Sequence, residues 1–175
     1  MWPGPAGVSV PLVASIDELG GLDRGRQHNG QAGLFTVAIG NNAVRQREFD
    51  ACLAQGLDPA TIIASTATVG GVVGAGSQVL EQAHVGPGAT LGCNVIVNTA
   101  AVVEHDVQVG DHVHIAPGAR LLAGVTVGTG TMIGAGAVVL PFVSVAAGCV
   151  VGAGSIVVKD VPAGCVVAGN PARPL

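Results

Sequence analysis

The residues of this chain that could carry out chemistry are concentrated in one short segment, VVEHDVQVGDHVHIAPGA, which spans residues 102–119. Only 10% of the chain is charged, yet this segment holds Glu104, His105, Asp106, Asp111, His112 and His114. A neutral imidazole can take a proton from an attacking amine or hydroxyl near neutral pH, and a neighbouring carboxylate stabilises the imidazolium that forms. His105 and Asp106 could therefore act together as a general base. The same triplet, Glu104 to Asp106, could instead be only a solvated polar corner.

A six-residue repeat surrounds this segment and indicates how it is positioned. Steps of six from Val73 to Val157 meet only Val, Leu or Ile, and the residue four positions after each is small or β-branched. An inward aliphatic residue, a turn and a small inward residue describe a short strand followed by a corner. Three such hexads close a triangular coil of eighteen residues, so that like positions stack at about 4.8 Å. Residues 73–162 therefore predict five coils of a parallel β-helix.

The repeat also bears on whether the three histidines could bind a metal. Eighteen residues before and after His105 lie Pro87 and Ala123, so the stacking places no second histidine above or below it. No metal is therefore expected, although the fold could still bring His105, His112 and His114 together around a metal ion. No serine or cysteine nucleophile stands beside His105, which favours direct attack over a covalent acyl-enzyme.

The residues before the repeat predict a small α/β unit over 1–64, followed by the β-helix over 65–175. VPLV (10–13), LFTVAI (34–39) and TIIA (61–64) are predicted strands, and Ser15 and Glu18 have the spacing of a helix capping box. A second helix is predicted from Asn42 to Gln55, with Gly56 as its stop. Its packed side is predicted to consist of Val44, Phe49, Cys52 and Leu53. Two or three strands cannot bury a core alone, so this unit must dock on another surface.

Composition excludes several classes of protein. Seven Lys and Arg residues stand against eleven Asp and Glu residues, which leaves no basic surface for nucleic acid or anionic lipid. The uncharged stretch over 121–158 is broken every few positions by Gly, Thr, Ser or Pro, so we expect no membrane span. The N-terminus lacks the pattern of a signal peptide. The four cysteines show neither metal-ligand spacing nor a paired framework, which favours reduced thiols in a cytoplasmic protein.

Three segments of the chain resemble a known family. VNTAAVVEHDVQVGDHVHIAPGA, the tail VVAGNPAR and the upstream VAIGNNAVR are similar to the bacterial sugar acetyltransferases with a left-handed parallel β-helix. That family includes sialic acid O-acetyltransferases and N-acetyltransferases that act on nucleotide-linked 4-amino-sugars. The resemblance covers residue 8 to the C-terminus, and it implies a left-handed helix, acetyl-CoA as co-substrate and a homotrimer with sites between subunits. The apolar faces of a slim prism also point to association.

The resemblance implies roles for particular residues. It makes His105 the general base, Asp106 the residue that supports this base, and His114 a neighbour of the acetyl-CoA thioester. It places the pantetheine arm along main-chain groups of stacked coils, at Ala135 and Ala153. The small side chains there leave the backbone approachable, although alanine also simply fills these positions of the repeat. His112 has no assigned role, and we expect it to be solvated or at an interface.

The resemblance is weakest at the N-terminus. Members of the family begin with a Gly-rich loop between two strands that helps to bind the nucleotide-sugar, and residues 1–39 do not contain it. Only Gly40 corresponds to that site, at what we expect to be the end of a strand. The fragment is therefore interpreted as a truncated Rossmann-like unit, and nucleotide-sugar binding is expected to be weak. A non-catalytic trimeric scaffold or a degenerate subunit is the alternative to an enzyme that acetylates the amine or hydroxyl of a sugar.

Overall fold

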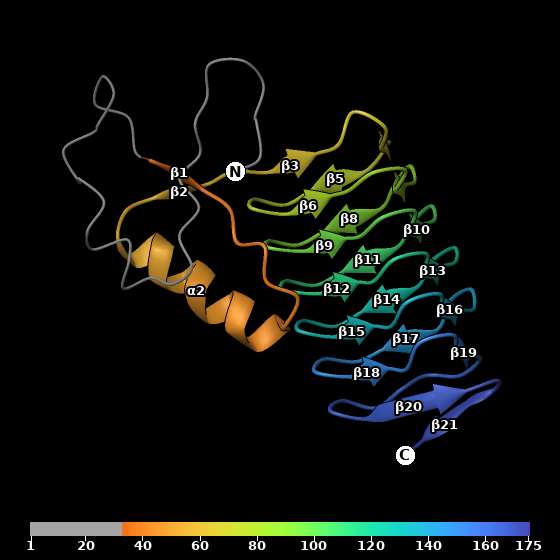
Figure 1. The fold of residues 1–175 in the computed structure, drawn as a ribbon. Coiled ribbons are helices and arrows are strands. Elements are labelled where there is room, and N and C mark those ends of the chain that lie inside the picture. The colour runs from red at the N-terminus through yellow and green to blue at the C-terminus, as the bar shows by residue number, and fades with distance from the viewer. Residues whose placement is uncertain (1–32) are drawn as a thin grey trace.

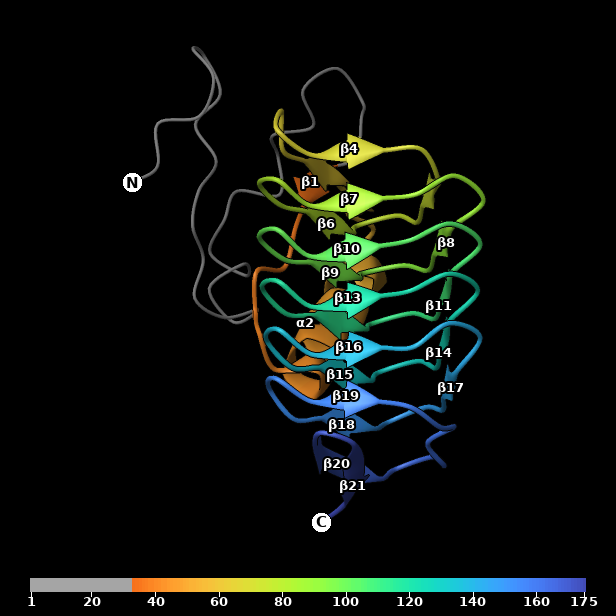
Figure 2. The same ribbon diagram turned by 90° about the vertical axis from the view of Figure 1, so that its right-hand side faces the viewer.

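The computed structural model describes residues 33–175. A small unit of two strands and a helix comes first, followed by a stack of very short strands wound into a three-sided prism (Figures 1 and 2). The strand expected at 10–13 and the capping box at Ser15 and Glu18 lie outside the described residues. None of the helices in residues 33–175 is long and apolar enough to cross a membrane.

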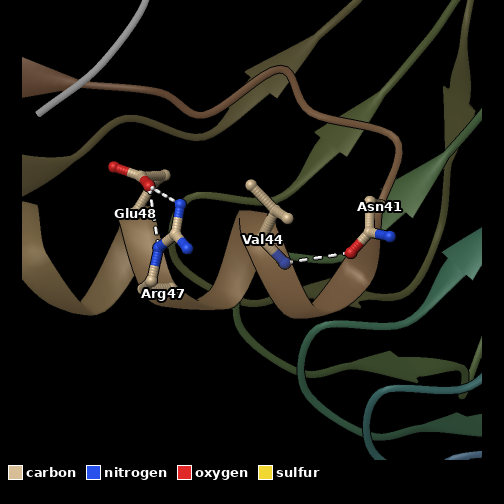
Figure 3. Close-up of polar contacts among 4 residues, drawn as sticks. All are labelled: Asn41, Val44, Arg47 and Glu48. Carbon is tan, nitrogen blue, oxygen red and sulfur yellow. Dashed lines mark hydrogen bonds and ion pairs between the residues drawn. The ribbon is translucent and has the colours of Figure 1, made fainter.

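The first unit consists of β1 (Leu34–Phe35), α2 (Asn42–Ala54) and β2 (Asp58–Pro59), with β1 and β2 paired in parallel. The side chain of Asn41 caps α2 by accepting the Val44 N–H (Figure 3). Gly56 has a φ of 76° just past the helix end, a conformation that glycine adopts without steric cost. The strand expected over 34–39 is wrong beyond Phe35, because β2 offers only two residues for pairing.

The packed side of α2 differs from the prediction. Arg45, Phe49 and Cys52 are buried, whereas Leu53 is 43% exposed. Positions 45, 49 and 52 lie on one stripe of a helix, at the i, i+4 and i+7 spacing, and Leu53 is turned away from it. The apolar pattern alone does not reveal Arg45, because a buried arginine is not part of an apolar stripe.

Three parallel sheets form the faces of the prism. One sheet, called the helix face because α2 covers it, comprises β3 (Ile62–Ile63), β6 (Gln78–Val79), β9 (Ile96–Val97), β12 (His114–Ile115), β15 (Met132–Ile133), β18 (Val150–Val151), β20 (Val166–Gly169) and the antiparallel β21 (Ala172–Pro174). The second face comprises β4 (Thr68–Val69), β7 (His84–Val85), β10 (Val102–Val103), β13 (Arg120–Leu121), β16 (Val138–Val139) and β19 (Ile156–Val157). The third face comprises β5 (Val72–Val73), β8 (Thr90–Leu91), β11 (Gln108–Val109), β14 (Thr126–Val127) and β17 (Ser144–Val145).

The register of these sheets follows the sequence repeat. Val103 pairs with Val85 in the coil before it and with Leu121 in the coil after it, each eighteen residues away. The second residue of most strands points inward and is buried, so that stacked Val, Leu, Ile and Ala side chains fill the prism. From Gly76 to Gly154 every sixth residue has a positive φ, which marks the corners. The parallel β-helix predicted from the hexads is therefore confirmed.

Helix α2 lies along the helix face and packs against successive coils (Figure 1). The Phe49 ring is 5.3 Å from the Phe35 ring and 5.9 Å from the His112 ring, measured between centroids. The small unit thus shares an interface with the β-helix at the corner between the third face and the helix face.

Candidate active site

His105 lies at the corner between β10 and β11, where the second face meets the third. Its side chain is 56% exposed, and its Nδ1 atom is 2.8 Å from Oδ2 of Asp106, whose side chain is 71% exposed. A carboxylate oxygen can only accept, so this contact places the proton of the neutral ring on Nδ1. The lone pair of Nε2 is then free to accept a proton from a group approaching through solvent-accessible space.

The neighbouring coils hold this corner in place through the backbone. The Asp106 N–H donates to the Pro87 carbonyl in the coil before, and the Gly124 N–H donates to the His105 carbonyl from the coil after, both at 3.1 Å. Asp106 itself has a φ of 61°, which aspartate tolerates better than most residues. A Cβ atom at Gly86 would come within 2.8 Å of the His105 backbone nitrogen, so the two coils touch here.

His114 lies elsewhere, on the helix face, where it is 7% exposed. Its Nε2 atom is 3.1 Å from Nδ2 of Asn98, and its Nδ1 atom is 3.2 Å from the Gly40 carbonyl oxygen. The Asn98 Oδ1 atom accepts the Thr99 N–H at 2.8 Å, which fixes the orientation of that amide. His114 therefore accepts at Nε2 and donates from Nδ1, and this is the neutral ring.

Electrostatics favour the same state of His114. Burial lowers the pKa of His114, and the nearby Arg45 cation lowers it further, while the bond to the Gly40 carbonyl acts in the opposite direction. The net pKa lies below the ordinary value for histidine. The ring is thus held neutral near pH 7.

Gly40 lies directly before the helix cap Asn41 rather than at the end of a strand, because β1 already ends at Phe35. The residue that sequence analysis assigned to acceptor binding nevertheless contacts His114, which is 74 positions away. The fold therefore brings Gly40 and His114 together, and it brings His105 and Asp106 together as a separate pair.

The two pairs lie on opposite sides of one prism. A corner between two faces of a triangle is opposite the third face, so His105 and the helix-face residue His114 cannot meet within one chain. Ala135 and Ala153 are exposed at the remaining corner, between the helix face and the second face. Their backbone N–H groups donate to no acceptor within residues 33–175, whereas the Ala135 carbonyl accepts the Gly154 N–H at 2.8 Å.

Two hollows on the described surface lie away from these residues. One hollow of about 330 Å³ lies near the C-terminal end, between Val157 and Pro174, and another of about 350 Å³ lies on the third face over β8, β11 and β14. Among residues 33–175, no three His, Cys, Asp or Glu side chains gather closely enough to hold a metal ion. Neither of the two hollows joins His105 to His114.

His112, which was expected to be solvated or at an interface, lies at the interface between α2 and the β-helix. It is 9% exposed, because α2 covers the corner on which it lies, and its Nδ1 atom is 2.9 Å from Nδ2 of Asn94. Three further polar residues near the site had no role in the sequence analysis: Asn42, Arg45 and Asn98. All three lie in segments that carry the family resemblance, Asn42 and Arg45 in VAIGNNAVR and Asn98 in VNTAAVV. The resemblance therefore marked these segments, but it did not indicate which residues the three side chains contact.

Comparison with known proteins reveals similarity along most of the chain. Residues 88–123 match the family model described as bacterial transferase hexapeptide (six repeats). A comparison with curated proteins finds none that matches.

Several solved structures are similar. The acetyltransferase domain of PglB from Neisseria gonorrhoeae, which has also been solved with acetyl coenzyme A, is 42% identical, with a TM-score of 0.79 over 80% of this chain and 69% of that chain. PerB from Caulobacter crescentus, solved with CoA and GDP-perosamine, is 33% identical, with a TM-score of 0.81 over 85% of this chain and 72% of that one. WeeI from Acinetobacter baumannii is 26% identical, with a TM-score of 0.65 over 83% and 72%.

Proposed function

Because the chain belongs to the hexapeptide-repeat sugar acetyltransferases with a left-handed parallel β-helix, we propose that it transfers the acetyl group of acetyl-CoA to the amine of a nucleotide-linked amino-sugar. The similarity to PerB supports the acceptor class, since that enzyme was solved with CoA and GDP-perosamine. The similarity to the PglB domain supports acetyl-CoA as the donor.

The observation that carries the proposal is the His105–Asp106 pair on an exposed corner. The amine nitrogen attacks the thioester carbonyl carbon, and Nε2 of His105 takes the proton that the nitrogen loses. Asp106 stabilises the resulting imidazolium through Nδ1. When the carbon–sulfur bond breaks, the departing CoA sulfur receives that proton, so the products are an amide and CoA thiol. General-base help of this kind contributes roughly 10²–10⁴ in rate.

We further propose that the working site lies between two subunits of a homotrimer. His105 and His114 are on opposite sides of one prism, so a site that uses both needs His105 from one copy and His114 from its neighbour. Closed rotational symmetry generates three equivalent sites of this kind. The Gly40 carbonyl, which contacts His114, would place the acceptor-binding unit at the same junction.

The pantetheine arm would follow the exposed corner at Ala135 and Ala153. Their unpaired backbone N–H groups, within the part of the chain that the structure describes, can donate to the amide oxygens of the arm. Alanine side chains leave the approach to these groups open.

Because all four cysteines are free thiols, the proposal also places the protein in the cytoplasm, where acetyl-CoA is made and thiols stay reduced.

A thiol-release assay tests the proposed reaction. Acetyl-CoA is mixed with the protein and a panel of free amino-sugars, nucleotide-linked 4-amino-sugars and sialic acid, and CoA thiol is measured. We expect release with nucleotide-linked amino-sugars and a product with one new amide. Absence of release with every acceptor, together with absence of acetyl-CoA binding in calorimetry, would show a non-catalytic solenoid instead.

A subunit-mixing experiment tests the shared site. His105→Ala and His114→Ala chains are each expected to be inactive, and co-expression at equal amounts should restore about a quarter of the wild-type sites by random assembly. Recovery cannot occur if each site is built within one chain. Sedimentation of the wild-type protein as a monomer at micromolar concentration would also contradict the arrangement.

A further inference from the structure

Arg45, which belongs to the VAIGNNAVR segment, is buried without any carboxylate partner among the described residues. Its relative exposure is 0%, and the ion pairs within residues 33–175 join only Arg47 with Glu48 and His105 with Asp106. An unpaired buried cation is costly unless its donors are satisfied. Burial lowers the pKa of Arg45 to about 10, so the group is still a cation at neutral pH.

The guanidinium donates to four backbone carbonyls. Nη1 donates to Ile39 at 3.0 Å, and Nη2 donates to His112 at 2.7 Å and to Val113 at 3.3 Å. Nε donates to Asn94 at 3.3 Å. The planar fork of arginine can reach several acceptors in fixed directions at once, which a lysine ammonium does not reproduce.

These contacts flank the bond between His114 and Gly40. Ile39 directly precedes Gly40, whose carbonyl accepts from His114, and Val113 directly precedes His114 itself. One side chain therefore holds the peptide on each side of this bond. Its positive charge also opposes a second positive charge on the neighbouring imidazole.

We propose that Arg45 is a positioning residue for the acetyl-transfer site, which fixes His114 as the neutral ring protonated at Nδ1 and aligned with the Gly40 carbonyl. The inference rests on the proposed function, because that function gives His114 its place beside the reacting thioester. Arg45 touches neither co-substrate in this arrangement, and it acts through the two backbone segments that it joins.

Two residues of the same helix provide matched controls. Asn42 Nδ2 donates to the carbonyls of Gly130 and Thr131 in a later coil, at 2.9 and 3.0 Å, and so docks α2 without contacting Ile39, Gly40 or Val113. The Thr131 carbonyl also accepts the His114 backbone N–H at 3.1 Å, so Asn42→Ala loosens a neighbour of His114 while leaving the Arg45 contacts in place. Arg47 is an arginine with 72% exposure, and it pairs with Glu48, whose side chain is 15% exposed (Figure 3). A merely structural role for Arg45 predicts that Arg45→Met and Asn42→Ala behave alike.

The test is nitrogen NMR of the histidine rings in the protein without added ligands, with the His114 signals assigned by their loss in His114→Gln. We expect the wild type, Asn42→Ala and Arg47→Met to show one Nδ1-protonated form of His114. In Arg45→Met, His114 should show a mixture of the two tautomers, or the protonated ring, at pH 7. Arg45→Lys, which keeps the charge but lacks the fork, gives the same readout if Arg45→Met does not fold, and it should also show the tautomer mixture.

A kinetic readout accompanies the spectra. We expect Arg45→Lys to lower kcat in thiol release by about tenfold to a hundredfold, with a smaller change in the KM for acetyl-CoA. An unchanged His114 tautomer in both Arg45 variants would overturn the inference, whatever their thermal stability. The spectra can be recorded without turnover. If the wild-type protein does not transfer acetyl groups, the proposed function is wrong, while the spectra still test the role of Arg45.

Discussion

The Nδ1 atom of His114 lies 3.2 Å from the carbonyl oxygen of Gly40, although 74 positions separate the two residues in the chain. The contact joins the β-helix to the unit that precedes it, and it requires a proton on Nδ1 while Nε2 accepts from Asn98. A positively charged ring would have to give up the Asn98 bond, since both of its nitrogens would be donors. The contact therefore couples the protonation of His114 to the docking of the first unit.

This coupling predicts a dependence of stability on pH. The pKa of His114 is lowered in the folded state, so the unfolded chain binds the proton more readily. The free energy of unfolding should be highest above about pH 6.5, the ordinary pKa of histidine in an unfolded chain. It should decrease as the pH falls from there towards the lowered pKa of His114 in the folded state. Urea unfolding between pH 5 and pH 8 measures the slope. His114→Gln, which keeps one donor and one acceptor, should show a shallower slope, and an unchanged slope would contradict the account.

A substitution one coil away should displace the backbone of His105 without changing the imidazole itself. Gly86→Ala would place a methyl group 2.8 Å from the His105 backbone nitrogen and 2.9 Å from the Glu104 carbonyl carbon. The coils must then separate, which should cost about 1–3 kcal/mol of stability and displace the His105 corner. We expect kcat in thiol release to fall on the order of tenfold.

Gly128→Ala is the matched control for that variant. Its new methyl group would meet the backbone of Ala146 and Ala147, again between stacked coils but at a different corner. Both variants should lose thermal stability, whereas only Gly86→Ala should lose kcat. Equal losses of kcat would mean that the loosened prism, rather than the position of His105, limits turnover.

Asp106→Asn tests whether the negative charge of Asp106 supports catalysis beyond its hydrogen bond to His105. Asparagine keeps the size of the side chain and can keep a hydrogen bond to His105 Nδ1, but it cannot neutralise the imidazolium. A hydrogen bond to a charged group is worth about 1.5 kcal/mol at the low end, so we expect kcat to fall on the order of tenfold, with the KM for acetyl-CoA nearly unchanged. Activity equal to the wild type would remove Asp106 from the mechanism.

The hexad pattern made most of the fold predictable. An inward aliphatic residue at every sixth position leaves only a triangular coil that can bury all of them, so the strands, corners and core follow from spacing alone. The His105–Asp106 contact could also be anticipated, because adjacent residues at a corner need no tertiary information. Contacts within one coil join residues that are close in sequence, so the sequence pattern predicts them.

The long-range contacts were not predictable in the same way. Arg45 was missed because its acceptors are backbone carbonyls, which carry no sequence signal. His112 occupies a corner that would be solvated if α2 did not cover it, and nothing in the hexad pattern marks the covered face. The nine-residue spacing of His105 and His114, one and a half hexads, places them on opposite sides of the prism. A role for both residues in one site can be recognised only when a second copy of the chain is considered.

Turnover of the His105→Ala protein tests the central claim most directly. The variant and a His84→Ala control are assayed for thiol release with acetyl-CoA and a nucleotide-linked amino-sugar. The control removes a histidine from β7, the strand that pairs with β10 one coil before the His105 corner. Calorimetry measures acetyl-CoA binding by both. We expect His105→Ala to lose roughly 10²–10⁴ in kcat while its affinity for acetyl-CoA stays close to that of the wild type, and His84→Ala to retain full turnover. Wild-type kcat in His105→Ala would show that His105 is not the base.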